Sequence, residues 1–219
     1  MLRGDFHMHT WYSHDCATRP VDLVKRCEQV GLNCIAVTDH NSIKGALEAR
    51  DLSPGIVIIG EEIKTTEGEV TGLFLEEEIK PGLSPMETVL LIKEQGGLVS
   101  LPHPFDRLGR SPLPLNVIRD IMPYVSIVEA FNARTRLSKD TNRSREFGVA
   151  NNLLMTSVSD SHTLGELGRC YTEFPDFDGS ADGFRRALKD AHLIEYRSKP
   201  WVHVFTTLNK LRRRLTRAS

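Results

Sequence analysis

The chain has 219 residues, of which 40% are hydrophobic and 26% are charged, and its formal net charge is −1. This is the composition of a globular protein long enough to bury a core, and a charge near zero provides no overall field for nucleic acid or a membrane surface. The sequence has no apolar run long enough for a membrane helix, and its first ten residues lack the apolar centre of a secretory signal. Its four cysteines contain no CxxC pair. We therefore expect a cytoplasmic protein with reduced thiols.

Apolar runs and helix-start signals alternate along the chain. Helix signals include Pro20 at a first-turn position, Gly31 as a stop, and Ser84 followed by Glu87 as a capping box. The predicted strands are 2–6, 33–40, 55–62, 69–76, 98–104, 125–132 and 154–162, with further candidates at 170–174 and 193–197, and the predicted helices are 19–31, 42–52, 84–97 and 144–152. This alternation predicts an α/β protein with a mostly parallel sheet or barrel, folded as a single domain over 1–219.

Polar side chains gather where these strands end. In a β/α barrel the carboxyl ends of the strands meet on one face, so residues distant in sequence share one cavity there. The residues at these ends are His7, His9, Asp39, His40, Glu61, Glu62, His103, Glu129, Asn132, Asp160 and His162. The sequence therefore predicts one composite site.

The composition of this set is typical of a metal centre. His7 and His9 are two residues apart, so on an extended strand both rings point to the same side and can reach one cation. Asp15, His40, Glu62, His103, Asp160 and His162 supply more nitrogen and oxygen donors than one tetrahedral ion needs. We expect two or three divalent ions, and Mn, Zn or Fe suits the mixture better than Mg. Such ions can lower the pKa of a bridging water to about 7 and clamp a phosphoryl group.

Five ordered motifs, "DFHMHT", "AVTDHN", "GEEI", "PHP" and "SDSH", resemble those of the PHP (polymerase and histidinol phosphatase) family, in particular its small stand-alone phosphoesterases. The resemblance runs from Asp5 to about Phe174. It implies a distorted seven-stranded, TIM-like β/α barrel, with His7, His9, Glu62 and Asp160 on one metal, Glu62 and His103 on a second, and Asp15, His40 and His162 on a third. Many relatives have a histidine where this chain has Glu69. Either Glu69 is a substitute ligand or the second metal is weaker or absent.

Other polar residues have less specific signals. Asp39 is expected to orient His40 or the neighbouring backbone, and Glu61 to be a surface charge or a partner of a ligand. Candidates for binding the substrate phosphate are Arg134, Arg19 and Lys64. The forked guanidinium group of arginine matches the geometry of phosphate oxygens. Arg107 and Arg110 lie in a loop that could border the entrance. The basic segment at about 200–217 is expected to form a helix docked on the barrel.

These features favour a metal-dependent phosphoesterase that acts on a small phosphorylated substrate such as a nucleotide, without a membrane or an obligate protein partner. The residues expected to take part in catalysis, through a metal-bridged hydroxide and proton transfer, are Asp15, His40, Glu62, Asp160 and His162. A PHP-type exonuclease acting on RNA or DNA ends is the main alternative. A metal-binding domain without turnover and a metal-dependent amidohydrolase are further ones.

Overall fold

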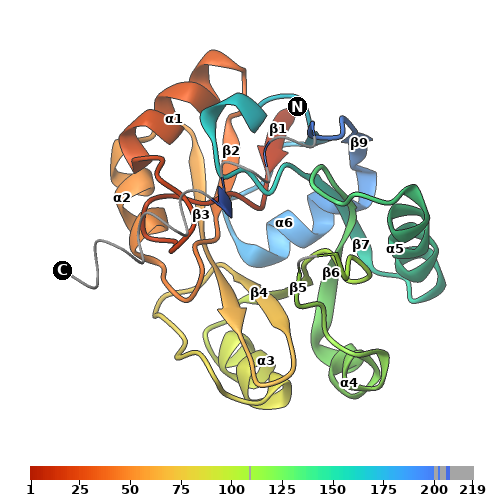
Figure 1. Ribbon diagram of the computed structural model, residues 1–219. Helices are drawn as coiled ribbons and strands as arrows, with labels where there is room; N and C mark the ends of the chain where they lie inside the picture. Colours follow the sequence, from red (N-terminus) through yellow and green to blue (C-terminus); the bar gives the residue numbers. More distant parts are fainter. Residues whose placement is uncertain (109, 200–201, 203–205, 208–219) are drawn as a thin grey trace.

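A computed structural model describes residues 1–108, 110–199, 202 and 206–207. Its sheet has the order β7-β6-β5-β4-β3-β2-β1-β8-β9 and curls into a nearly closed barrel surrounded by helices (Figure 1). The strands are β1 (Leu2–Asp5), β2 (Cys34–Val37), β3 (Ile56–Lys64), β4 (Glu69–Leu73), β5 (Leu98–Leu101), β6 (Val125–Asn132), β7 (Leu154–Val158), β8 (Tyr171–Phe174) and β9 (His192–Ile194). The predicted α/β class and distorted barrel are confirmed.

The helices are α1 (Pro20–Gln29), α2 (Lys44–Leu52), α3 (Pro85–Glu94), α4 (Leu115–Ile121), α5 (Ser138–Ala150) and α6 (Ala181–Ala187). In α1 the buried side chains Pro20, Leu23, Val24 and Cys27 recur at helical spacing, which explains why this segment packs as a helix on the sheet. The expected capping box begins α3, where the Ser84 hydroxyl accepts from the Glu87 amide at 3.2 Å. The sequence analysis did not predict α4 or α6.

The strand β4 runs antiparallel to both of its neighbours, β3 and β5. Only residues 65–68 connect β3 to β4, and a parallel pair needs a crossover of a dozen residues or more, so a hairpin is the one possible connection. The remaining contacts among β1–β3 and among β5–β7 are parallel. The carboxyl ends of these six strands therefore lie at the same end of the barrel.

The barrel closes where the segment after β1 meets the segment after β7. Met8 and Ser161 form a parallel bridge, and the His9 amide donates to the Ser161 carbonyl at 2.9 Å. Residues 2–4 of β1 pair with β8, which runs antiparallel to β1. This closure brings the histidine-containing motifs that follow β1 and β7 side by side.

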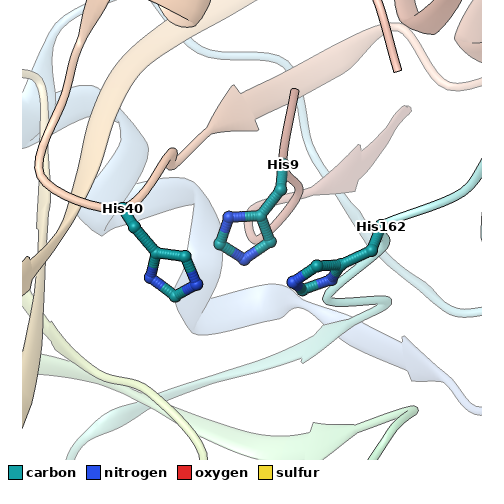
Figure 2. Close-up of side chains that lie close together, drawn as sticks. All are labelled: His9, His40 and His162. Atoms are coloured by element: carbon teal, nitrogen blue, oxygen red, sulfur yellow. The ribbon is translucent and has the colours of Figure 1, made fainter. Parts of the chain in front are cut away.

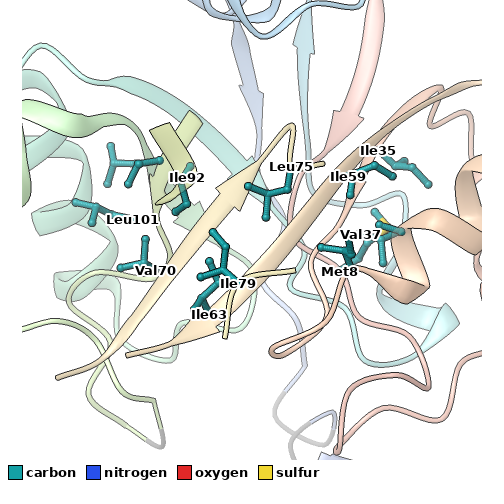
Figure 3. Close-up of a cluster of buried hydrophobic side chains, with 14 of the residues drawn as sticks. Met8, Ile35, Val37, Ile59, Ile63, Val70, Leu75, Ile79, Ile92 and Leu101 are labelled. Carbon is teal, nitrogen blue, oxygen red and sulfur yellow. The ribbon is translucent and has the colours of Figure 1, made fainter. Parts of the chain in front are cut away.

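Two large apolar clusters hold the helices and the sheet together. The first extends across β2, β3 and β4, where Val37, Ile59, Ile63 and Val70 are buried (Figure 3). The second contains Cys34, Ala36 and Ile58, which alternate along β2 and β3 with members of the first, and it stacks Phe6, Phe174 and Phe184 edge to face, with ring centroids 4.9–5.7 Å apart. Among the described residues, none of the helices has the length and apolar character to cross a membrane. The expected terminal helix at about 200–217 falls almost entirely outside the described residues.

Candidate metal centre

The histidines and carboxylates of the predicted set converge at the carboxyl ends of the barrel strands. His7 and His9 follow β1, Glu62 lies in β3, and Asp160 follows β7. All four side chains are buried, with 0–1% of their surface exposed. Segments more than 150 residues apart in sequence thus form one cluster, as the strand-end argument predicts.

Four donor atoms of this cluster form a compact group. The Nε2 atoms of His7 and His9 are 3.1 Å apart, and they lie 3.4 Å and 3.6 Å from Glu62 Oε2. Asp160 Oδ1 lies 3.8 Å from His7 Nε2 and 3.4 Å from His9 Nε2. Zinc ligands at about 2.0–2.1 Å in tetrahedral geometry are separated by roughly 3.3 Å, close to these values. The spacing therefore fits one ion at the centre of the group.

The hydrogen bonds around the two histidines leave the correct nitrogens available. His7 Nδ1 lies 2.5 Å from Glu129 Oε1, and His9 Nδ1 lies 3.1 Å from the Ser13 hydroxyl. Since Ser13 donates its own proton to Asp39 Oδ1 at 2.6 Å, it accepts from His9. With these partners, the neutral form of each ring carries its proton on Nδ1 and has the Nε2 lone pair free for a metal.

The two carboxylates are left in need of a cation. Glu62 Oε2 and Asp160 Oδ1 are buried and accept no hydrogen bond from the described residues. Burial raises the pKa of both groups, but His7 and His40 beside Glu62, and Arg110 and His7 beside Asp160, lower each pKa well below its usual range. Both are therefore ionised. Buried, charged oxygens without donors are expensive in a protein, and a divalent cation would satisfy them. The residues present fit a metal.

Further donors lie on both sides of this group. His162 Nε2 and His40 Nε2 lie 3.2 Å and 3.6 Å from Asp15 Oδ2, so the expected third set is also assembled. The rings of His9, His40 and His162 lie together, with the His9 ring centroid 4.6 Å and 4.2 Å from the other two (Figure 2). On the far side, His103 Nε2 lies 3.0 Å from Glu62 Oε1.

Glu69, at the start of β4, lies close enough to join these donors. One ligand atom each of His40, Glu62 and Glu69 can be chosen so that all three lie within 4.8 Å of one another. Burial and the negative charge of Glu62 raise the pKa of Glu69. A neighbouring cation would reverse that effect. Of the two alternatives, this placement favours Glu69 as a substitute ligand over a second metal that is weaker or absent.

The backbone is strained at two of the candidate ligands. His103 has a φ of 29° and Asp160 a φ of 53°, in the left-handed region that residues other than glycine rarely adopt. Such conformations cluster at functional sites because the surrounding structure has to hold them. Here they turn the side chains at the ends of β5 and β7 toward the barrel axis.

A cavity of about 300 Å³ opens above the donors. Its lining combines acids and histidines of the cluster with basic and hydroxyl side chains, and consists of His14, Asp15, His40, Glu62, Glu69, Leu108, Arg110, Ser111, Arg134, Arg136, His162, Thr206 and Thr207. Arg110 pairs with Asp160, so the loop after β5 borders the site as expected. The cavity therefore offers anionic ligands for metals and cationic groups for an anion.

Arg134 is the arginine most firmly built into this wall. Its side chain is buried, and its Nη1 lies 2.5 Å from His162 Nδ1. Its Nη2 donates to the Thr206 hydroxyl at 2.6 Å, and its Nε lies 3.7 Å from Glu166 Oε1. Arg134 thus connects the loop after β7 to residues near the end of the described chain.

Two of the expected phosphate-binding residues lie elsewhere. Arg19 is exposed at the start of α1 and forms an ion pair with Asp22, with Arg19 Nε 2.6 Å from Asp22 Oδ2. Lys64 is half-buried, and its Nζ lies 3.8 Å from Glu69 Oε1. Neither residue lines the cavity. Position in sequence does not specify which way a long side chain points.

The structure corrects the expected surface position of Glu61 and agrees with an orienting role for Asp39. Glu61 is fully buried rather than on the surface, on the face of β3 opposite Glu62, where its Oε2 accepts from the Ile79 amide at 2.9 Å. Burial raises its pKa to about 8. Asp39 accepts from the Thr10 amide at 2.7 Å and from Ser13, so it orients the loop after β1. Strand alternation could have predicted the opposite faces of Glu61 and Glu62.

Comparison with known proteins identifies the family. Residues 5–103 match the PHP domain and residues 140–193 match the PHP-associated region. Two uncharacterized proteins of Methanocaldococcus jannaschii are similar to this chain. MJ0417 is 34% identical over 182 residues, which cover 81% of this chain and 72% of MJ0417. MJ1587 is 42% identical over 123 residues, which cover 50% of this chain and 72% of MJ1587.

A solved structure shares the fold. It is a two-domain protein from Bacteroides vulgatus that contains a predicted PHP-like metal-dependent phosphoesterase. It superposes with a TM-score of 0.73 at 19% identity, covering 95% of this chain and 69% of that one. Its fold agrees with the matched motifs and with the identity to the archaeal relatives. The chain therefore belongs to the PHP family, whose members include PHP-like metal-dependent phosphoesterases.

Proposed function

We propose that this protein is a metal-dependent phosphoesterase that hydrolyses a small phosphomonoester or nucleotide-type phosphoester. The observation that supports this most directly is the group of four donor atoms from His7, His9, Glu62 and Asp160. The distances of 3.1–3.8 Å between the two histidine Nε2 atoms and from these atoms to the two carboxylate oxygens suit one ion, and the group lies under a cavity with three arginines in its wall. Metal ligands below and guanidinium groups above are the combination that phosphate esters require.

The residues that would hold the metals are those brought together at the strand ends. His7, His9, Glu62 and Asp160 would hold the first ion, Glu62 and His103 with Glu69 a second, and Asp15, His40 and His162 a third. When bound, such ions supply a water of lowered pKa and a Lewis acid for the phosphoryl oxygens. Mn, Zn and Fe suit the donor set better than Mg, because histidine supplies so many of the donors.

The side chains of the cavity wall would bind and orient the substrate. Arg110, Arg134 and Arg136 would attract a phosphate by their positive charge, since the Nη groups of Arg134 already donate to His162, Thr206 and Val202 and Arg110 already pairs with Asp160. Arg134 is the best placed, because Thr206 and Glu166 hold it and its orientation is therefore fixed before the substrate arrives. His14, on the exposed rim beside the His40 ring, is placed to hold or release a proton at the leaving group.

The size of the cavity favours a small substrate. A volume of about 300 Å³ lies at the lower end of ligand pockets, which span roughly 300–1,000 Å³. That space suits a phosphomonoester or one terminal nucleotide. An exonuclease would also have to track a chain of phosphates with many basic side chains, so we rank the phosphomonoester first.

The test is a phosphate-release assay with defined metals. The purified protein would be stripped of metal and reloaded with Mn, Zn, Fe or Mg, then assayed on nucleotides, sugar phosphates, histidinol phosphate and short oligonucleotides. His9→Ala removes a ligand, and Glu61→Gln is the matched control, because Glu61 is equally buried but faces away from the cluster. We expect metal-dependent release that His9→Ala abolishes and Glu61→Gln retains.

Three results would contradict this proposal. Phosphate release that persists in the metal-free protein would exclude the metal-dependent reaction. Stoichiometric metal uptake without release from any phosphoester would favour a binding role or another hydrolysed bond. Cleavage of an oligonucleotide from its end, with no release from mononucleotides, would favour the exonuclease instead.

A further inference from the structure

Glu129 is a buried carboxylate that contacts both His7 and His103, and it is not one of the expected metal ligands. It lies in β6, with 3% of its surface exposed. Its Oε1 is 2.5 Å from His7 Nδ1, and its Oε2 accepts from the His103 amide and the Asn132 side-chain amide, each at 2.8 Å. The His103 amide can only donate, and Asn132 is held as a donor because its Oδ1 accepts from the Arg134 amide at 3.0 Å. Glu129 therefore acts on both sides of Glu62, at the first and second proposed ions.

A bulge in β6 makes this arrangement possible. Residues three apart in a regular strand point to opposite faces, yet Asn132 contacts Glu129. The β6–β7 register shifts between Glu129 and Phe131, which inserts one extra residue and returns Asn132 to the inner face. Asn132 Nδ2 also donates to Asp160 Oδ2 at 3.0 Å. Glu129 is thereby connected to a third candidate ligand.

The contact to His103 explains how its backbone is held. With a φ of 29°, His103 has a conformation that needs support from its surroundings. Its amide N–H points at Glu129 Oε2, and its ring nitrogen Nε2 lies 3.0 Å from Glu62 Oε1. The carboxylate thus fixes the backbone that aims this ring.

We infer that Glu129 is a positioning residue that sets the tautomer of His7 and the backbone of His103, and so couples the two metal sites. The inference deepens the proposed function, since it rests on the proposed use of both histidines as ligands. Glu129 itself would touch neither metal nor substrate. Its role requires both oxygens to be acceptors, because donors approach from two sides.

This requirement makes Glu129→Gln a sharp test. The amide group of glutamine has one acceptor oxygen and one donor nitrogen. The oxygen has to face the His103 amide and Asn132, which can only donate, so the NH₂ group faces His7 Nδ1. His7 then becomes the acceptor at Nδ1 and moves its proton to Nε2, where it blocks the lone pair that a metal needs.

The first measurement is the tautomer of His7 by ¹⁵N NMR of the imidazole nitrogens in the metal-free protein, at a pH above the His7 pKa so that the ring is neutral. Burial lowers this pKa, but the carboxylates of Asp160, Glu129 and Glu62 raise it well above its usual value. We expect the Nδ1–H form in the wild type, the Nε2–H form in Glu129→Gln, and the wild-type form in Glu129→Asp, which keeps two acceptors. Glu61→Gln is the control, and should leave the His7 signals unchanged. Identical His7 signals in the wild type and Glu129→Gln would overturn the inference.

The second measurement is Co²⁺ binding by titration calorimetry and absorption. We expect Glu129→Gln to weaken the tightest site by about 10–100-fold, the effect usual for the partner of a metal-bound histidine, with Glu61→Gln at the wild-type affinity. If Glu129→Gln does not fold, Glu129→Asp replaces it: its acceptors are drawn back by one methylene, so weaker binding is expected. Wild-type affinity in the folded variant would overturn the inference. A wild-type protein that binds no Co²⁺ would defeat the proposed function, while the NMR result would still decide whether Glu129 sets the tautomer.

Discussion

Asp5, the last residue of β1, should make the stability of the metal-free protein depend on pH. It is completely buried, with Oδ1 accepting from the Ser159 amide at 3.0 Å and Oδ2 accepting no hydrogen bond from the described residues. Burial raises its pKa from the ordinary 3.8 to about 7, and the bonds from Ser159 offset this only in part. The carboxyl is therefore neutral in the folded protein at mildly acidic pH, where it is ionised in the unfolded chain.

The sign and size of the effect follow from this difference. Between pH 3.8 and about 7 the folded protein holds a proton that the unfolded chain has lost, so the free energy of unfolding falls by about 1.36 kcal/mol per pH unit. Over that interval the loss amounts to about 4 kcal/mol, and it is complete above the folded-state pKa. Asp5→Asn cannot ionise, so its stability relative to the wild type should rise by about this amount from pH 4 to pH 8.

Urea unfolding of both metal-free proteins across this pH range, followed by circular dichroism, measures the difference. Other titrating groups are shared by the two proteins and cancel. Asp22→Asn is the control, and its difference from wild type should stay nearly constant from pH 4 to pH 8, because the Arg19 hydrogen bond lowers the pKa of Asp22 and the group is then ionised in both the folded and the unfolded protein. A difference between Asp5→Asn and wild type that stays constant with pH would refute the reasoning.

Three further substitutions test the surroundings of the site. In Gly45→Ala the new Cβ would lie 2.0 Å from Asp39 Oδ2, so we expect a loss of about 1–3 kcal/mol in the free energy of unfolding and weaker metal binding; a wild-type melting curve would contradict this. Thr206→Val removes the hydroxyl that accepts from Arg134, and leaving that buried donor unpaired should cost about 1–3 kcal/mol in urea unfolding, whereas no change would show that the contact is dispensable. Arg19→Ala should leave kcat/KM for phosphate release within about twofold, because Arg19 is exposed and does not line the cavity, and a tenfold loss would restore it to the site.

Local patterns were sufficient for the elements that follow simple rules. The helix α1 and the capping box of α3 are specified by apolar spacing and by Ser84 with Glu87, which act within one or two turns. The antiparallel direction of β4 could also have been predicted from the sequence, because residues 65–68 are too few for a crossover. The short helices α4 and α6 were missed, since seven residues offer too few positions for a helical period to appear.

The sequence by itself determined which kind of site to expect. His7, His9, Glu62 and Asp160 are metal-ligand types placed at the ends of the strands β1, β3 and β7, and the carboxyl ends of parallel strands meet on one face whatever the details of packing. The approximate set of candidate ligands therefore follows from residue type and order, and the five motifs give the family resemblance.

Only the tertiary structure decided which atoms face each other. The bulge before Phe131 reverses the alternation of β6 and brings Asn132 beside Glu129, and no local pattern of residues specifies that extra residue. In the same way, Arg134 is in the wall of the cavity while Arg19 pairs with Asp22 on the surface, although both are arginines near the ends of strands or motifs. Contacts between segments depend on register, twist and side-chain direction, which are settled when the barrel closes.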